Sequence, residues 1–288
     1  MLNTPTMNLD LIRTFVIVGQ SKGIYEAASK LNLDYTNVSR HIKALEKLYG
    51  TKLVRTISKN YIELTEDGKE LFDGYEKAYN LLFLAEKNFI QNKNLNSGKI
   101  SIGTSTDIEL NFLNDKIIRF KQKYANTAFK ITNSPIKELY EKLTHYNIDF
   151  VIGDQLNLKR SDGIKSKVLY NEEYCLVYDE KKYTINNLSD INELSLILPV
   201  STKSERKLFE NLLQENNVKR NLSVETSNYC ASLDLAYKGV GIALVPTSMT
   251  KNNTLSKYEL PFKKPIVISY VEENLSPSSY EFLKEFDN

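Results

Sequence analysis

The chain has 288 residues, which is enough for about two domains of average size. Hydrophobic residues (41%) and charged residues (26%) occur in the proportions of an ordinary soluble globular protein. The net charge of only +2 excludes a chain-wide attraction to nucleic acid or to membranes, so any such attraction has to be local. No segment approaches the ~20 apolar residues that a membrane-spanning helix needs, and the first apolar stretch predicts a core-facing helix and not an export signal. We therefore expect a cytoplasmic protein with no membrane partner.

Residues 27–50 (AASKLNLDYTNVSRHIKALEKLYG) predict two short helices joined by a tight turn. The small pair Ala27–Ala28 would let the helices cross closely, and Asp34 stands where the second helix needs an N-cap. The second helix has an apolar face of Val38, Ile42, Leu45 and Tyr49, and a polar, basic face of Thr36, Ser39, Arg40, Lys43 and Lys47. This pattern is typical of a DNA-binding helix-turn-helix, whose second helix enters the major groove. An ordinary amphipathic helical hairpin shows the same pattern, so this segment alone does not separate the two.

Residues 51–68 (TKLVRTISKNYIELTEDG) predict a small β-hairpin, because β-forming residues flank a polar tip at residues 58–60. A hairpin directly after a recognition helix is a wing, and its basic residues can reach phosphates. Between Asp34 and Asn60 there are six basic and two acidic side chains, a local net charge of +4. The positive charge is thus concentrated where DNA would lie.

Residues 7–68 resemble the winged helix-turn-helix of LysR-type transcriptional regulators, and the resemblance extends over nearly the full chain. The matching positions include Phe15, Ala27–Ala28, Leu31, Val38–Ile42, Leu45–Glu46, Gly50, Arg55 and Leu64–Glu66. The resemblance implies a winged helix-turn-helix DNA-binding domain over residues 1–65. The sequence departs from the family pattern at Ile24, where a serine is usual, and at residues 34–36, where Ser-Gln-Pro is usual; the wing is longer and lacks the usual arginine pair. These departures fall at positions that would touch bases, so they concern base preference and leave the fold intact.

From Glu66 to about Asn94 the sequence predicts one long helix. Its apolar residues are spaced alternately by four and three positions, a heptad seam of nearly three repeats formed by Leu71, Tyr75, Ala78, Leu82, Ala85 and Phe89. So regular a seam predicts a partner helix, although packing against the protein's own body would give the same pattern. The resemblance implies a dimer-forming linker helix over residues 66–96, in a homodimer or a dimer of dimers (a homotetramer). The polar stretch 92–98 predicts the boundary to the next domain.

Beyond Gly98 predicted strands alternate with predicted helices, which favours parallel α/β layers. The strands are expected at 99–104, 129–133, 149–153, 174–178, 194–198 and 222–225, and the helices at 115–124, 137–146, 204–216 and 229–237. The run GVGIALVP (239–246) leads into a buried strand and not into a helix, so it is not a dinucleotide fingerprint. The resemblance implies a two-lobed α/β effector domain over residues 97–288, similar to periplasmic binding proteins. Lobe I would cover about 99–169 and 265–288, and lobe II about 170–261.

A recognition helix reads bases with side chains from its first two turns. By resemblance, the groove-facing positions are Tyr35, Thr36, Ser39 and Arg40. Arg40 suits a bidentate contact with guanine, and Tyr35 and Thr36 suit thymine methyl groups. Lys43 and Arg55 are expected to contact phosphates, which position the protein without specifying sequence. Asn37 is a candidate adenine reader that could instead cap the turn.

Ligands of open α/β folds lie beyond the carboxyl ends of strands, against helix N-termini. The candidate effector-binding residues stand at such junctions, and matching segments line the inter-lobe cleft in the family: Thr104, Ser105, Thr106, Ser134, Ser201, Thr202, Ser227 and Asn228. Hydroxyls and free backbone N–H groups suit a small polar metabolite, above all an anionic one. The nearby Asp107, Glu109 and Asp154 could instead favour a cation or an amine. Each of the candidates could equally be only a helix cap.

The sequence predicts no catalytic site, no metal site and no cofactor. It contains no nucleophile–base pair and no P-loop, and its two histidines, His41 and His145, are too few and too far apart for a metal site. Cys175 and Cys230 fit small buried residues better than a redox switch, because neither lies in a basic environment. The leading hypothesis is a ligand-responsive regulator that binds double-stranded DNA and is not an enzyme. The alternative, a small-molecule binding protein without a transcriptional role, is opposed by the basic helix and wing.

Overall fold

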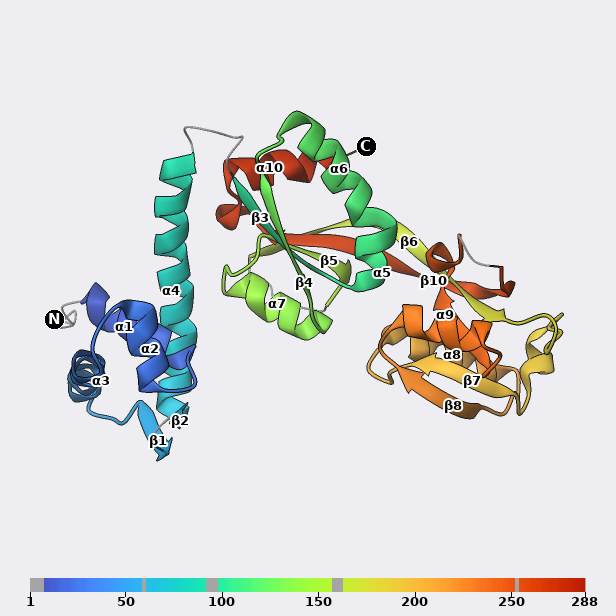
Figure 1. The fold of residues 1–288 in the computed structure, drawn as a ribbon, viewed down its shortest axis with the longest axis horizontal. Coiled ribbons are helices and arrows are strands. Elements are labelled where there is room, and N and C mark those ends of the chain that lie inside the picture. Colours follow the sequence, from blue (N-terminus) through green and yellow to red (C-terminus); the bar gives the residue numbers. More distant parts are fainter. Residues whose placement is uncertain (1–7, 59–60, 92–97, 157–162, 252–253, 288) are drawn as a thin grey trace. The chain divides into compact units, whose positions relative to one another are not determined.

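The structure is a computed structural model that describes residues 8–58, 61–91, 98–156, 163–251 and 254–287 (Figure 1). The chain divides into two compact units, one of residues 1–94 and 141–147, and the other of residues 95–140 and 148–288. The first unit contains the elements α1 (Leu9–Gly19), α2 (Ile24–Leu31), α3 (Tyr35–Tyr49), β1 (Val54–Ser58), β2 (Tyr61–Leu64) and α4 (Glu66–Gln91). The predicted pair of short helices, hairpin and long helix are therefore all confirmed. The hairpin tip at 59–60 and the predicted boundary at 92–97 lie outside the described residues.

Local sequence signals fix both ends of α3. The Asp34 side chain accepts a hydrogen bond from the backbone N–H of Asn37 at 2.8 Å, which is the N-cap that the sequence predicted. At the other end Gly50 adopts a left-handed conformation (φ 70°) and donates its N–H to the carbonyl of Glu46 at 2.8 Å. Glycine adopts this conformation without the steric cost that a side chain brings, so Gly50 stops the helix where the wing begins.

The apolar faces of the short helices form the core of the first unit. Ala27 and Val38 are fully buried, and Leu45 and Leu53 nearly so. Tyr49, which the sequence placed on the same apolar face, is 40% exposed instead, because it lies in the last turn, beyond the packed part of α3. The long helix α4 starts so close to the wing that a β-carbon at Gly68 would collide with the carbonyl oxygen of Leu53.

The heptad seam of α4 is divided between two environments. Its first residues, Leu71 and Tyr75, pack with Phe72 against the core of the helix-turn-helix. Further along the helix Leu82 is 49% exposed and Phe89 is 75% exposed. The expectation of one continuous seam facing a partner is thus corrected: the first turns are held by the protein's own body, and only the later turns leave apolar side chains uncovered.

The second unit is an α/β structure with one curled sheet of eight strands in the order β4-β3-β5-β10-β6-β9-β7-β8. Its strands are β3 (Lys99–Thr104), β4 (Ala128–Asn133), β5 (Phe150–Asp154), β6 (Ile164–Tyr178), β7 (Ser195–Pro199), β8 (Asn221–Thr226), β9 (Ile242–Pro246) and β10 (Ser256–Val271). Its α-helices are α5 (Thr106–Ile108), α6 (Asn114–Lys123), α8 (Ser204–Glu215), α9 (Tyr229–Tyr237) and α10 (Pro277–Leu283). The helix α7 (Ile136–Thr144) begins in this unit and ends within the segment 141–147 of the first. A short π-helix, η2 (Glu109–Leu113), joins α5 to α6, and 3-10 turns occur at η4 (Leu188–Ile191), η5 (Thr247–Thr250), η6 (Glu272–Asn274) and η7 (Lys284–Phe286).

Two parallel β-layers, one in each lobe, are joined by an antiparallel pair. In lobe I, β3 lies between β4 and β5, and in lobe II, β7 lies between β8 and β9, with parallel pairing in both. The long strands β6 and β10 pair antiparallel to each other and run from one lobe into the other (Figure 1). Sequence reasoning found only the last part of β6 and missed β10 as a strand, although residues 257–260 of β10 alternate between polar and apolar side chains.

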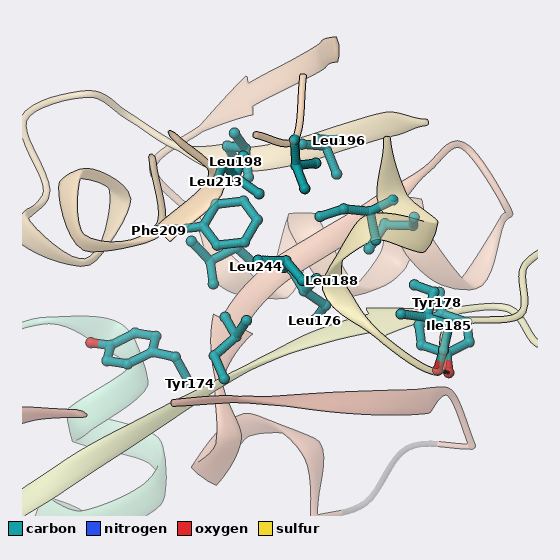
Figure 2. Packing of buried hydrophobic residues seen from close by; sticks show 14 residues of the cluster. Tyr174, Leu176, Tyr178, Ile185, Leu188, Leu196, Leu198, Phe209, Leu213 and Leu244 are labelled. Atoms are coloured by element: carbon teal, nitrogen blue, oxygen red, sulfur yellow. Dashed lines mark hydrogen bonds between the residues drawn. The ribbon is translucent and has the colours of Figure 1, made fainter. Parts of the chain in front are cut away.

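Each lobe has its own hydrophobic core. Ile100, Phe120, Phe150 and Phe282 belong to the core of lobe I, where aromatic rings meet edge to face. In lobe II, Phe209 of α8 packs over apolar residues of the sheet (Figure 2). Separate cores in the two lobes of one continuous sheet make the unit two-lobed, as expected.

Candidate DNA-reading surface and effector site

The polar face of α3 is open to solvent. Thr36, Arg40 and Lys43 are exposed, Ser39 is half-buried, and Tyr35 is 44% exposed. The opposite face packs into the core of the unit, with Ile42 only 5% exposed. The helix therefore presents its candidate base-reading side chains together on a single accessible surface.

The side chains of the first turn of α3 hold one another in place. The Asn37 amide donates to the second carboxylate oxygen of Asp34 at 3.0 Å, and its oxygen accepts from Nη2 of Arg40 at 2.5 Å. Asn37 is thus engaged on both sides, so its amide orients the guanidinium of Arg40. Sequence reasoning left open whether Asn37 reads bases or caps the turn; here its side chain bridges the cap residue and Arg40.

The wing is fixed to α3 by the carboxylate of Glu46, a role that sequence reasoning missed. Glu46 is 8% exposed, and Oε1 accepts the backbone N–H of Leu53 at 3.1 Å and that of Val54 at 3.4 Å. Its other oxygen pairs with Lys52 Nζ at 2.7 Å. Arg55, on the wing, keeps a 67% exposed side chain paired with Glu63 at 3.0 Å. Glu46 therefore does not oppose DNA on the reading surface but positions the wing beside it.

The ring of Tyr35 is stacked on that of Tyr25, the second residue of α2. Their centroids are 4.9 Å apart and the ring planes differ by 28°. Tyr25 is 52% exposed. Sequence reasoning missed this partner, because the contact joins two helices and follows no helical spacing.

The candidate effector residues differ in burial and in hydrogen bonding. Thr104 is fully buried and donates its hydroxyl to the carbonyl of Ile152 at 2.9 Å, so that hydroxyl belongs to the sheet. Asn228 caps α9 by accepting the N–H of Cys230 at 2.9 Å. Ser201, Thr202, Thr106 and Ser227 are exposed, and Ser105 and Ser134 are half-buried. The side chain of Thr104 serves the sheet and that of Asn228 serves the helix cap, so neither residue needs an effector to explain it.

A buried charge cluster joins the lobes. Nζ of Lys264 (β10) lies 2.8 Å from Asp154 Oδ1 at the end of β5 and 2.6 Å from Glu205 Oε2 in the first turn of α8. The exposed fractions of the Lys264 and Glu205 side chains are 13% and 1%. Ser204 donates its hydroxyl to Asp154 at 2.9 Å, and the Tyr229 hydroxyl donates to Glu205. One ammonium thus holds a carboxylate from each lobe.

The protonation states of this cluster follow from its contacts. Burial alone would raise the pKa of Glu205, but the ammonium groups of Lys264 and Lys203 outweigh it and hold the pKa below its usual value. Burial would lower the pKa of Lys264, and its two carboxylates raise it above the usual value instead. Both groups therefore stay charged at neutral pH.

Another buried carboxylate, Glu172 on β6, lies at a hollow of about 560 Å³. It accepts the backbone N–H of Ser248 at 3.3 Å and its hydroxyl at 3.1 Å. Burial raises the pKa of Glu172, with Asp107 adding to the effect. Glu172 has no ion-pair partner among the described residues, so the protein tolerates this charge only through neutral donors.

The two cysteines are both free thiols. Cys175 is fully buried, which raises the pKa of its thiol to about 11, whereas Cys230 is exposed. A buried thiol with a raised pKa carries little thiolate at neutral pH.

Among the described helices, none is both long and apolar enough to cross a bilayer.

Residues 9–69 match the family model described as "Bacterial regulatory helix-turn-helix protein, lysR family", and residues 93–284 match "LysR substrate binding domain". The chain belongs to the LysR family of transcriptional regulators. It is therefore a DNA-binding regulator with an effector-binding domain.

Curated relatives of this LysR-type regulator are similar over most of their length. The transcriptional regulator GltR of Bacillus subtilis is 25% identical, covering 84% of this chain and 81% of that protein. BsdA of the same organism is 26% identical, covering 84% and 85%. These relatives are transcriptional regulators.

Solved LysR structures share the fold at lower identity. Full-length CbnR in complex with its target DNA superposes with a TM-score of 0.71 at 18% identity, over 98% of this chain and 99% of CbnR. A full-length OxyR variant of Pseudomonas aeruginosa gives 0.73 at 17% identity, over 98% and 95%. At such identities the likeness supports the fold alone.

Proposed function

We propose that this LysR-type regulator reads its operator with the first turns of α3. Tyr35, Thr36, Ser39 and Arg40 would contact base edges, and Lys43 and Arg55 would contact phosphates. Asn37 would act by orienting Arg40. We further propose that the chain works by binding and not by catalysis, in the cytoplasm where its DNA target lies.

The observation that carries this proposal is the division of α3 into two faces. Its apolar face is buried against α1 and α2, while its polar face is exposed and flanked by a wing that Glu46 holds in place. A helix that is braced on one side and open on the other fits the major groove, which admits one α-helix.

The direct test is a gel shift with the DNA upstream of the protein's own gene. We expect a retarded complex that survives excess scrambled DNA of the same length. Competition by the scrambled DNA as effective as by the upstream DNA would leave only non-specific binding and would refute sequence-specific reading at that site.

We also propose that two copies associate through the later turns of α4. The apolar side chains that the described chain leaves uncovered there, Leu81, Leu82, Phe83 and Phe89, are between 39% and 75% exposed. Exposed apolar stripes of this kind mark association surfaces. A homodimer follows from one such contact, and a homotetramer needs a second.

For the effector we propose a small polar metabolite bound at the junction of the two lobes, near the exposed hydroxyls of Ser201 and Thr202. The residue types at the strand ends favour an anionic metabolite. Such a ligand would have to compete with Asp154 and Glu205 for ammonium groups that are already paired with these carboxylates. The carboxylates of Asp154 and Glu205 at this junction favour instead an effector that carries an amino group or several hydroxyls.

A thermal-shift screen with matched small acids and amines tests this proposal. A compound that stabilises the parent should stabilise the double variant Ser201→Ala, Thr202→Val less, and should stabilise the control Ser223→Ala equally. Equal stabilisation of the double variant would place the effector elsewhere, and stabilisation by acids alone would refute the preference for amines.

A further inference from the structure

The stacked pair of tyrosines lies at the edge of the DNA-reading surface. Tyr25 and Tyr35 leave about half of each ring in solvent, at 52% and 44% exposed. The other stacked aromatic pair among the described residues joins Phe262 to Tyr174, which is only 2% exposed and belongs to the core of lobe II. An exposed stack on a helix-turn-helix therefore requires a reason other than core packing.

The stack fixes the direction of Tyr35. This residue is the first of α3, and a ring at a helix start has little helix around it to restrict its rotamer. The Tyr25 ring covers one face of it at a centroid distance of 4.9 Å, so Tyr35 keeps its edge and other face accessible. Neither phenol hydroxyl has a hydrogen-bond partner within the described residues. Both rings thus remain available to a partner in a defined orientation.

The chemistry of the surface indicates which feature of DNA would meet it. The major groove presents donors, acceptors and, only at thymine, an apolar methyl group. The neighbouring Arg40 and Ser39 supply hydrogen bonds, and the tyrosine rings supply an apolar surface beside them.

We propose that Tyr25 is a positioning residue for operator reading: it braces Tyr35 so that the Tyr35 ring contacts a thymine methyl group of the operator. This inference rests on the proposed reading role of α3 and extends it to α2. Tyr25 acts through Tyr35, so its removal should weaken the methyl contact without changing the number of phosphates neutralised.

The experiment replaces each thymine of the footprinted operator by uracil, which lacks only the methyl group. For the parent we expect one or two positions at which this replacement weakens binding about fourfold, the factor that corresponds to the burial of one methyl group. In Tyr25→Ala the same replacements should have no effect, operator affinity should already be reduced by that factor, and the dependence of affinity on salt should keep its slope. Tyr25→Phe keeps the ring and should behave as the parent.

The control is Tyr237→Ala, which removes a 65% exposed tyrosine at the end of α9 and should leave every value unchanged. Thermal unfolding of Tyr25→Ala and Tyr25→Phe separates a loss of fold from a loss of contact. Continued sensitivity to uracil in Tyr25→Ala, or none in the parent, overturns the inference. If Arg40→Ala still lowers operator preference in that case, the reading role of α3 stands and only the role of Tyr25 falls.

Discussion

The two units expose their charged groups in opposite ways. On α3, Arg40 and Lys43 are exposed, and Arg40 is oriented by its neighbour Asn37. At the lobe junction, Glu205 and Lys264 are buried and paired with each other. A surface for a large, highly charged partner is thus ready before the partner arrives, whereas a ligand that enters the junction has to replace contacts that the protein already makes. The comparison predicts DNA contact without rearrangement and effector binding with it.

The largest effect is expected from breaking the junction. Lys264→Met leaves the carboxylates of Asp154 and Glu205 without their shared ammonium, and the loss of one partner of a buried pair costs about 3–5 kcal/mol. Urea unfolding of the full chain should show this loss. The matched control is Lys263→Met, whose 61% exposed side chain lies 3.8 Å from Glu173 and should contribute less than about 1 kcal/mol. Equal losses in the two variants would show that the junction is not held electrostatically.

The uncovered apolar turns of α4 allow a test of how two copies associate. Leu82→Glu would place two carboxylates across a dimer contact and should weaken association about a hundredfold, or ~2.8 kcal/mol. Sedimentation measures the dissociation constant. Leu110→Glu, which replaces an equally exposed leucine (54%) in the other unit, should not change it. A Leu82→Glu dimer as tight as the parent would mean that these turns do not form the interface.

The wing provides the corresponding test in the first unit. Glu46→Ala leaves the backbone N–H groups of Leu53 and Val54 without their acceptor, at a cost of about 1–3 kcal/mol. The unfolding transition of this unit should shift, and non-specific DNA binding should weaken as the wing loosens. Glu66→Ala, which removes an 89% exposed carboxylate at the start of α4, is the control. A stable protein with normal DNA affinity would contradict the role assigned to Glu46.

The sequence predicted the first unit more fully than the second, for a physical reason. Helical spacing and caps are local, so the α3 faces, Asp34 and Gly50 could be found from neighbours along the chain. Lys264 contacts Glu205, which lies 59 positions away along the chain, and the Tyr25–Tyr35 stack joins two helices. No spacing rule relates such residues. The hydroxyl of Thr104 makes it a candidate effector ligand in the sequence, but the structure shows that this hydroxyl donates to the carbonyl of Ile152 in the sheet.

The smallest effect on stability is expected from Glu172. Because burial raises its pKa, the folded state binds a proton more tightly than the unfolded chain, and stability falls as the pH rises through the raised pKa. Glu172→Gln removes this penalty and should raise the unfolding temperature by about 1–3 °C at pH 7 and not at pH 4. The parallel measurement on Glu173→Gln, which is exposed, should show no such pH dependence. A variant that is less stable at pH 7 would show that the contact with Ser248 outweighs the buried charge.

The most direct test of the account is the operator preference of Arg40→Ala. Fluorescence anisotropy with the footprinted operator and with scrambled DNA gives the ratio of the two dissociation constants. We predict that the ratio falls by the equivalent of about 1–3 kcal/mol, with an unchanged unfolding temperature, while Arg119→Ala in the other unit keeps the parent's ratio. An unchanged ratio in Arg40→Ala would contradict the claim that the exposed face of α3 reads the DNA sequence.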